Sequence, residues 1–175
     1  MLAQISNRSI AHFDLDAFFV NVEYLRNAKL RGKPIAVGGQ SDRGVITSCS
    51  YEARKFGVHS AMPVKLAKRL CPELLIIRGD MDKYIDFSNL VTEIIRSEVP
   101  LFEKSSIDEF YIDMSGMDKF FGCVQYVMEL RKKIIKESGL GISYALSTNK
   151  LISKIATNEN KPNGQVEIQP GKEKS

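Results

Sequence analysis

Histidine and cysteine are scarce in this sequence. Its 175 residues include only two histidines, His12 and His59, which argues against a metal site or a nucleophile system built on histidine. There are three cysteines, and their odd number and wide spacing favour reduced, half-buried thiols over a disulfide framework or a zinc site. These are Cys49, Cys71 and Cys123.

Long apolar runs are also missing. A transmembrane helix needs about 20 consecutive apolar residues, and the sequence has no such run. Residues 1–8 have neither a basic start nor an apolar stretch, so we read no secretion signal and expect a cytoplasmic protein without a membrane partner. The composition, 43% hydrophobic and 26% charged, is that of a globular chain with one substantial core, or one domain with a smaller lobe.

Positive charge is concentrated in one part of the chain. Residues 26–83 contain 12 Lys or Arg against 5 Asp or Glu, a local charge of +7. The remainder has 13 against 16, a charge of −3. A basic lobe joined to a mildly acidic one suits a polyanionic partner on one side and metal-binding carboxylates on the other. On charge alone, a solvated basic surface is an equally good interpretation.

The apolar periodicity predicts alternating strands and helices, and therefore a mixed α/β (α+β) domain. A helix is expected to begin near Ala17, and a tight turn at 161–164 is expected to lead into a final strand. The other strands are expected at 9–14, 35–39, 44–48, 73–77, 101–104, 110–113 and 141–147, and the other helices at 51–56, 64–70, 82–99, 119–137 and 150–157.

Three carboxylates lie among apolar, strand-forming residues: Asp14, Asp108 and Glu109. A carboxylate in such surroundings is costly to desolvate unless a cation or hydrogen bonds compensate it. Three that meet in space repel one another unless divalent metal lies between them. The trio therefore indicates a phosphoryl-transfer site.

Local geometry limits which acidic residues can share a site. Neighbours on a regular strand point to opposite faces, so Asp108 and Glu109 need a turn or bulge, which the preceding residues 105–106 make plausible. Asp16 stands where a helix is expected to begin, so we interpret it as a helix N-cap and assign Asp14 to the chemistry. Without further context, an ordinary surface hairpin also explains the Asp108–Glu109 pair.

Four motifs in order resemble the Y-family DNA polymerases, especially the DinB or polymerase IV branch. Residues 12–19 (HFDLDAFF) resemble the family's opening motif, and 51–63, which contain YEARKFGV and AMP, its fingers motif. Residues 106–109 (SIDE) resemble the catalytic hairpin, and 161–164 (KPNG) the last palm motif. Each motif alone is weak, but together they span almost the whole chain and are highly specific.

The resemblance implies a two-metal site for DNA synthesis. Asp14, Asp108 and Glu109, joined by the backbone carbonyl of Leu15, are expected to hold two Mg²⁺ ions. One ion would activate the primer 3′-hydroxyl and the other would clamp the triphosphate of the incoming nucleotide. Magnesium prefers oxygen ligands, which suits an all-carboxylate contribution from the protein. His12 is expected to be a strand residue with a satisfied ring and no catalytic role.

The resemblance also assigns residues to the nucleotide. Tyr51 and Arg54 are three apart and share a helix face, from which a phenol and a guanidinium reach phosphate oxygens. Ser48 is expected to donate a further hydrogen bond and Lys161 to add a charge near the triphosphate.

Two aromatic residues complete the predicted nucleotide site. Phe19 is expected to be a steric gate against the sugar 2′-hydroxyl, and Phe18 to lie beside it, mainly in the core.

The resemblance further implies a polymerase palm with a ferredoxin-like mixed sheet and a small inserted fingers lobe. We expect palm at 1–18, fingers at 19–78, palm again at 79–168 and a frayed tail at 169–175. The family's thumb, little finger and terminal sliding-clamp peptide are not found, so we expect a palm-and-fingers fragment with little activity of its own. Its partners are expected to be primer-template DNA and a deoxynucleotide, with a sliding clamp only for a full-length protein.

Low-fidelity, lesion-bypass synthesis follows from the resemblance alone, and two other classes of function stay open. A module that binds single-stranded nucleic acid without chemistry would not need three site carboxylates, and paired aromatics on a sheet face are missing. A nucleotidyl cyclase with a palm-like fold would also use two metals. It would not need Tyr51, Arg54 and Phe19 in these positions.

Overall fold

The computed structural model describes residues 8–116 and 122–172. The chain divides into two compact units, one of residues 1–16 with 88–175 and one of residues 17–87. We call them the discontinuous unit and the inserted unit. The inserted unit extends beyond the predicted 19–78 lobe at both ends, and its assignment as fingers stays a prediction.

A five-stranded mixed sheet forms the discontinuous unit. Its strands are β1 (Ile10–Leu15), β5 (Phe102–Lys104), β6 (Glu109–Asp113), β7 (Ile142–Ser147) and β8 (Gln165–Glu167). Their order is β5-β6-β1-β7-β8. β1 lies at the centre and pairs antiparallel with β6 and with β7, while β7 and β8 are parallel. The central strand thus holds its residues against both neighbours.

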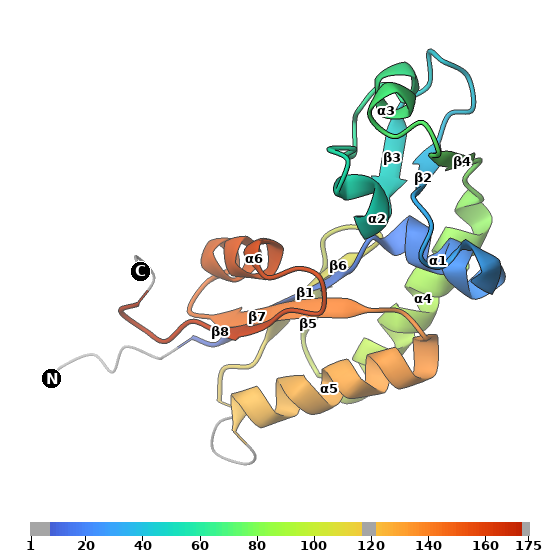
Figure 1. Cartoon of the computed structure of the whole chain (residues 1–175). Helices are drawn as coiled ribbons and strands as arrows, with labels where there is room; N and C mark the ends of the chain where they lie inside the picture. Colours follow the sequence, from blue (N-terminus) through green and yellow to red (C-terminus); the bar gives the residue numbers. More distant parts are fainter. Residues whose placement is uncertain (1–7, 117–121, 173–175) are drawn as a thin grey trace, which may run out of the picture. The chain divides into compact units, whose positions relative to one another are not determined.

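Helices cover both faces of this sheet. Figure 1 shows α6 (Lys150–Glu159) and α5 (Cys123–Ser138) on opposite faces. All six residues of β1 are buried, because the strand lies at the centre of the sheet and helices cover both of its faces. Any polar side chain on β1 therefore lies away from bulk water and needs a partner within the fold.

The inserted unit has its own small sheet, in the order β3-β2-β4. Its strands are β2 (Ile35–Gly38), β3 (Ile46–Cys49) and β4 (Leu75–Ile77). β2 pairs antiparallel with β3 and parallel with β4. The helical segments are α1 (Phe18–Arg26), η1 (Ala28–Leu30), α2 (Tyr51–Arg54), α3 (Val64–Leu70) and the beginning of α4 (Met81–Glu98), which continues into the discontinuous unit.

An apolar core of its own stabilises the inserted unit. It combines residues of β2, β3, α2 and α3, including Ala36, Ile46 and Ala67, all fully buried. Cys49 and Cys71 lie in the same core. They and Cys123 are free thiols, as predicted, but they are buried rather than half-buried. A small thiol packs well in an apolar core, where it behaves as a small hydrophobe.

The predicted mixed α/β class is confirmed, and the predicted elements agree with those observed to within a few residues. Residues 119–121 of the predicted 119–137 helix, residues 173–175 of the predicted tail and residues 1–7 lie outside the described part of the chain. Within the described part, no helix is both long and apolar enough to cross a membrane.

One local prediction is wrong: Asp16 does not cap the first helix. The residue at the N-cap position of α1 is Ala17, which makes no side-chain capping bond and has left-handed backbone angles, φ 39° and ψ 51°. Such angles are uncommon for a residue other than glycine. The side chain of Asp16 instead accepts hydrogen bonds from the Ser143 hydroxyl and the Asn163 N–H, within the discontinuous unit.

Candidate active site

Two carboxylates face each other at the end of the central strand pair. Asp14 on β1 is the direct register partner of Glu109 on β6. Like charges directly opposite one another on a sheet are destabilising. Only 4% of Asp14 is exposed, so water screens this repulsion poorly. The pair is therefore stabilised by neighbouring cations or by protonation of one carboxylate.

The third predicted carboxylate lies on the turn just before β6. Residues 105–108 connect β5 to β6, which confirms the turn that the sequence requires. Asp108 accepts a hydrogen bond from the Ser106 hydroxyl at 2.7 Å. Its backbone carbonyl accepts from the Leu15 N–H at 3.0 Å, which ties the turn to the end of β1. This turn lets Asp108 depart from strict strand alternation.

Two lysines pair with the opposed carboxylates. Lys161 Nζ forms an ion pair with Asp14 Oδ1, and 18% of the lysine side chain is exposed. Lys154, on α6, donates to Glu109 Oε2 at 2.8 Å. Each ammonium group contacts one oxygen of its carboxylate, and a side-chain hydrogen bond also links Asp14 and Glu109 to each other.

The pKa values of the two carboxyl groups move in opposite directions. Burial raises the pKa of Asp14 to about 7 against the lowering effect of Lys161, and the charges of Asp108 and Glu109 raise it further. Burial also acts to raise the pKa of Glu109, but the hydrogen bond and charge of Lys154 outweigh it and lower that pKa. As the pH falls through about 7, Asp14 therefore takes up a proton while Glu109 stays ionised.

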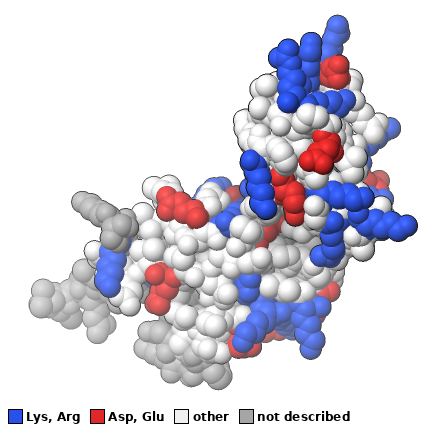
Figure 2. All heavy atoms as spheres, viewed as in Figure 1, with Lys and Arg blue, Asp and Glu red and all other residues white. Residues whose placement is uncertain are grey.

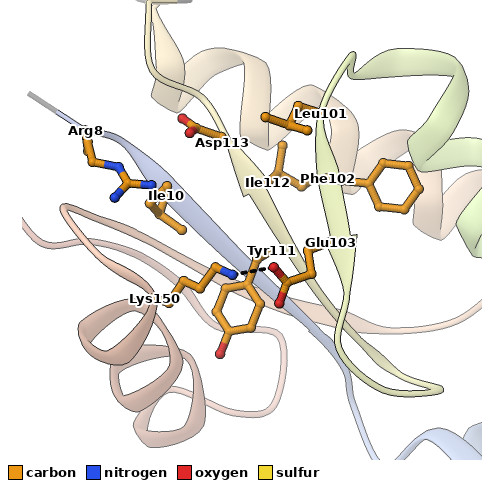
Figure 3. A pocket seen from close by; sticks show the side chains of 9 residues that line it. All are labelled: Arg8, Ile10, Leu101, Phe102, Glu103, Tyr111, Ile112, Asp113 and Lys150. Atoms are coloured by element: carbon orange, nitrogen blue, oxygen red, sulfur yellow. Dashed lines mark hydrogen bonds and ion pairs between the residues drawn. The ribbon is translucent and has the colours of Figure 1, made fainter. Parts of the chain in front are cut away.

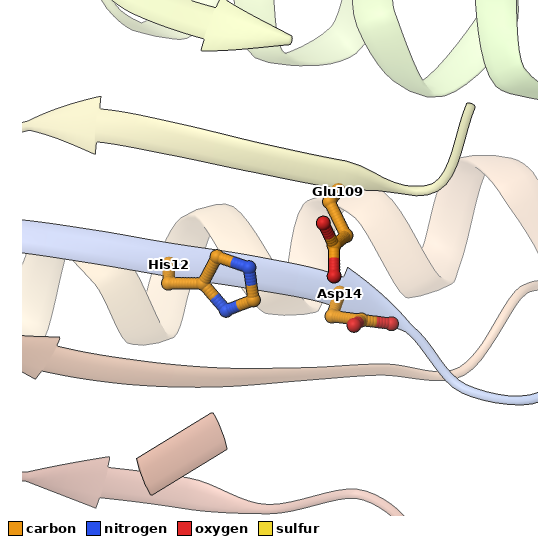
Figure 4. A group of neighbouring side chains, drawn as sticks. All are labelled: His12, Asp14 and Glu109. Carbon is orange, nitrogen blue, oxygen red and sulfur yellow. The ribbon is translucent and has the colours of Figure 1, made fainter. Parts of the chain in front are cut away.

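His12 lies on the same face of β1, two residues before Asp14. Figure 4 shows its ring beside the two carboxylates. Ligand atoms of His12, Asp14 and Glu109 all lie within 4.8 Å of one another. The described residues hold one such group of potential metal ligands, and it contains His12 rather than Asp108. Burial lowers the pKa of His12 to about 4, so its ring is neutral at pH 7.

The prediction that the His12 ring is satisfied is wrong for one of its nitrogens. Nδ1 lies 3.0 Å from the hydroxyl of Thr157 on α6, but Nε2 is buried without a hydrogen-bond partner. Nothing local in the sequence distinguishes the two nitrogens, because Thr157 is 145 residues away along the chain.

Asp16 holds the turn that carries Lys161. Its Oδ1 accepts from the Ser143 hydroxyl at 2.7 Å, and its Oδ2 accepts from the backbone N–H of Asn163 at 2.9 Å. Gly164 follows, where a Cβ would lie only 2.2 Å from the carbonyl oxygen of Asn160, so this position requires glycine. The buried carboxylate thus fixes the 161–164 turn, and with it the lysine that pairs with Asp14.

Helix α6 is anchored beside a cavity of about 420 Å³ on the discontinuous unit. Lys150, in its first turn, pairs with Glu103 of β5 and lies 5.2 Å from the centre of the Tyr111 ring. Figure 3 shows this pair at the cavity. Helix α6 is thus held at Lys150 by Glu103 and at Thr157 by His12. Lys154 lies between these two residues along the helix and donates to Glu109. The cavity itself contains neither Asp14 nor Glu109 in its lining.

The inserted unit carries the residues that the sequence assigns to the triphosphate. Ser50 caps α2 by accepting a hydrogen bond from the Ala53 N–H. The next turn places the Arg54 guanidinium 4.6 Å from the centre of the Tyr51 ring, so the two side chains share a face, as predicted. Arg54 is exposed, whereas Ser48 is buried, with 7% of its surface accessible.

The two consecutive phenylalanines differ in environment. Phe18 is buried, as predicted for a core residue, and Phe19 is half-buried. The Phe19 ring stacks on Tyr84, with centroids 4.5 Å apart, and Tyr84 donates to buried Glu23 at 2.8 Å. Phe19 and Tyr84 line a cavity of about 190 Å³ with Gly38 and neighbouring residues. The Phe19 ring, which the sequence assigns to sugar selection, therefore borders this cavity and is kept in position by stacking on Tyr84.

Basic side chains gather at one end of the inserted unit. Figure 2 shows them over α3 and the connection between β2 and β3. Arg43, Lys65, Lys68 and Arg69 are exposed there. Of these, Lys68 lies 3.6 Å from Asp42, a solvent-exposed pair of small energetic value. The local excess of positive charge is thus at the surface, where a polyanion can reach it.

Sequence reasoning missed three side chains of these sites: Lys154, His12 Nε2 and Tyr84. For Lys154 the one local signal is its spacing from Lys150, four residues earlier, which places both lysines on one face of a helix. Of the predicted residues, Asp14, Glu109 and Lys161 meet directly, and Asp108 lies on the adjoining turn. Phe19, Ser48, Tyr51 and Arg54 are placed within the inserted unit.

The chain is similar to known proteins in both sequence and fold. The model of the impB/mucB/samB family matches residues 13–158. A protein described as DNA polymerase IV from Treponema denticola is 48% identical over 163 residues, 93% of this chain and 41% of the relative. One of the same description from Dehalococcoides mccartyi is 40% identical, over 98% of this chain and 44% of the relative. The chain thus spans less than half the length of these relatives.

Solved structures agree with the fold. An insertion ternary complex of Dbh DNA polymerase superposes with a TM-score of 0.87 at 28% identity, covering 94% of this chain and 49% of that one. A crystal structure of DinB from Sulfolobus solfataricus gives the same TM-score and identity, covering 93% of this chain and 48% of that one. The mixed α/β fold described above is therefore the fold of the corresponding half of these polymerases.

Proposed function

The chain belongs to the impB/mucB/samB family, within the Y-family DNA polymerases, and on that premise we propose that it carries the nucleotidyl-transfer site of a template-directed DNA polymerase. Its substrates are a primer-template DNA and a deoxynucleoside triphosphate. The observation that carries the proposal is the direct opposition of buried Asp14 and Glu109, each with one oxygen engaged by a lysine.

The residues present fit divalent metal. Two opposed carboxylates and a third on the adjoining turn form a set of oxygen donors. Asp14, Asp108, Glu109 and the Leu15 carbonyl would hold two Mg²⁺ ions. Two Mg²⁺ ions held there would lower the pKa of the primer 3′-hydroxyl and neutralise negative charge on the phosphates.

The protein's own groups prepare this site for an anion. Lys161 and Lys154 hold positive charge beside Asp14 and Glu109, and with metal on these carboxylates each ammonium group would be free to bind phosphate oxygens. A cation bound beside Asp14 would favour its ionised form and so lower the pKa that burial, and to a smaller extent the charges of Asp108 and Glu109, raise. Asp16 keeps Lys161 in position through the 161–164 turn.

The inserted unit supplies contacts to the nucleotide. Arg54, stacked on Tyr51, presents a pre-oriented guanidinium for bidentate binding of phosphate oxygens, and the Ser48 hydroxyl adds a donor. Phe19, held by Tyr84, excludes a ribose 2′-hydroxyl. Low-fidelity, lesion-bypass synthesis in the cytoplasm follows from the family. A sliding clamp would be a partner of a longer protein.

Single-turnover primer extension tests the proposal. The chain is used in excess over primer-template DNA at low salt, because phosphate contacts weaken steeply as salt rises. We expect addition of the templated nucleotide, and a loss of about 100-fold or more in Glu109→Gln. Glu159→Gln, an exposed carboxylate on α6, is the matched control and should keep the wild-type rate. Equal rates in wild type and Glu109→Gln would contradict the proposal, as would product formed without regard to the template.

A further inference from the structure

His12 is the buried polar side chain of the site that the proposed function leaves unused. It lies two residues before Asp14 on β1, so both side chains point to the same face of the sheet. Its ring is completely buried and lies 4.7 Å, between centroids, from the ring of Tyr111. The imidazole is therefore held in place by packing rather than free to turn toward water.

Hydrogen bonding fixes which ring nitrogen carries the proton. The Thr157 hydroxyl lies 3.0 Å from His12 Nδ1 and within hydrogen-bond distance of two backbone carbonyls, that of Ser153 at 2.7 Å and that of His12 at 3.3 Å. Carbonyl oxygens only accept, so the hydroxyl proton is directed to one of them. It can then only accept from Nδ1, so Nδ1 is protonated and Nε2 carries a lone pair. Nε2 is buried without a hydrogen-bond partner.

That lone pair faces two other electron-pair donors. One ring nitrogen points toward Glu109 and Asp14 in Figure 4, and because Nδ1 is engaged by Thr157 on α6, the nitrogen facing the carboxylates is Nε2. The potential ligand atoms of the three residues lie within 4.8 Å of one another. Atoms bound at about 2.1 Å to one ion are at most about 4.2 Å apart, so a small contraction closes the group on a metal.

We propose that His12 Nε2, with Asp14 and Glu109, is a ligand of a divalent first-row transition-metal ion. This inference rests on the proposed function because it uses the same carboxylates. An imidazole nitrogen favours transition ions over Mg²⁺, which prefers oxygen. The Thr157 hydroxyl acts as the outer partner that orients the ring, as such partners do in metal sites.

Pulsed electron paramagnetic resonance with Mn²⁺ tests the ligand without any change to the fold. The wild-type chain is prepared with ordinary histidine and with ¹⁵N-labelled histidine. We expect a nitrogen coupling to bound Mn²⁺ that changes from the ¹⁴N to the ¹⁵N pattern on labelling. Absence of a nitrogen coupling in wild type, or a coupling unaffected by the label, would overturn the proposal.

The only other histidine provides a matched control. His59 is exposed, and its Nδ1 lies 2.8 Å from the carbonyl of Ser60. His59→Gln should keep the nitrogen coupling. Loss of the coupling in that variant would show that His59 is the nitrogen ligand and would overturn the proposal. His12→Phe, which keeps a ring against Tyr111, should abolish the coupling and weaken Mn²⁺ binding by about tenfold or more. Its Mg²⁺ affinity should change much less, and an equal loss for both ions would contradict a nitrogen ligand.

Asp14→Asn separates this proposal from the proposed function. If Mn²⁺ binding requires Asp14 but shows no histidine coupling, the carboxylate site stands and the assignment of His12 fails. If Mn²⁺ and Mg²⁺ both bind Asp14→Asn as tightly as wild type, the metal site of the proposed function fails as well. Coupling to histidine together with dependence on Asp14 supports both.

Discussion

Asp14 and Glu109 stand directly opposite each other across the β1–β6 ladder, with Asp14 almost fully buried. The fold thus holds together two groups that repel each other when both are ionised. A proton on Asp14 and the two lysines relieve the repulsion when metal is absent.

A first prediction concerns stability and pH. The folded-state pKa of Asp14 is raised to about 7 from an ordinary value of 3.8, so the folded state binds its proton more tightly than the unfolded state does. The free energy of unfolding should therefore be highest below about pH 4 as far as this group is concerned, and should fall as the pH rises to about 7. Urea unfolding across this range should show that fall in wild type. In Asp14→Asn the fall should be much smaller, and an identical pH dependence in both proteins would contradict the pKa.

A second prediction concerns protons released on metal binding. Asp14 must ionise to bind Mg²⁺, so binding should release a proton below its pKa and little above it. Calorimetric titrations in buffers of different ionisation enthalpy measure this number directly. We expect close to one proton at about pH 6 and close to none at about pH 8.5. A number that does not change with pH would show that Asp14 is not the titrating ligand.

The sequence was sufficient to predict the strand that bears Asp14 and the turn at Asp108 and Glu109. Both depend on local patterns: a continuous apolar run and the two-residue period of a strand. The role of Asp16 was not predictable in this way. Its partners, Ser143 and the backbone of Asn163, lie 127 and 147 residues away along the chain. A local pattern could only suggest a helix cap.

His12 and Phe19 show the same limit. The half-satisfied ring of His12 depends on Thr157, and the support of Phe19 depends on Tyr84 of α4. Periodicity places each residue on an element and a face, but it does not specify which distant element packs against that face. Side-chain pairing between elements far apart in sequence therefore had to come from the structure.

A third prediction follows from the Asp16 network. Asp16→Ala leaves the Ser143 hydroxyl and the Asn163 N–H without their acceptor, at a cost of about 1–3 kcal/mol in the free energy of unfolding. It should also weaken dNTP binding, because the turn that carries Lys161 loses its hydrogen bond to the Asp16 carboxylate. Urea unfolding and a dNTP titration measure the two effects. Asp113→Ala, an acidic residue at the far end of β6, is the control for dNTP binding. Wild-type values for both quantities in Asp16→Ala would contradict the positioning role.

A fourth prediction concerns Lys161, which should affect metal and nucleotide in opposite directions. Lys161→Met removes a cation that competes for Asp14, so Mg²⁺ should bind more tightly in the absence of nucleotide. The same change removes a charge near the triphosphate, so dNTP should bind about tenfold more weakly. Lys132→Met, an exposed lysine on α5, serves as control. Changes in the same direction for both ligands would contradict this account.

A fifth prediction concerns the choice of sugar. Phe19→Ala removes the ring stacked on Tyr84 and enlarges the adjoining cavity, so the preference for dNTP over rNTP should fall by about tenfold or more. Tyr84→Phe keeps the stacked ring and loses only the hydrogen bond to Glu23. It should retain the preference while lowering stability. Competitive binding of the two nucleotides measures the ratio, and an unchanged ratio in Phe19→Ala would remove Phe19 from sugar selection.

Magnesium-dependent binding of a dNTP tests the central claim most directly. The claim is that the opposed carboxylates hold the metal that binds the triphosphate, and calorimetry of wild type, Asp14→Asn and Glu109→Gln, with Glu159→Gln as control, addresses it. We predict that wild type and Glu159→Gln bind dNTP only when Mg²⁺ is present, and that both site variants lose this binding. Binding of equal strength without Mg²⁺, or Mg²⁺-dependent binding that survives in Asp14→Asn, would contradict the account.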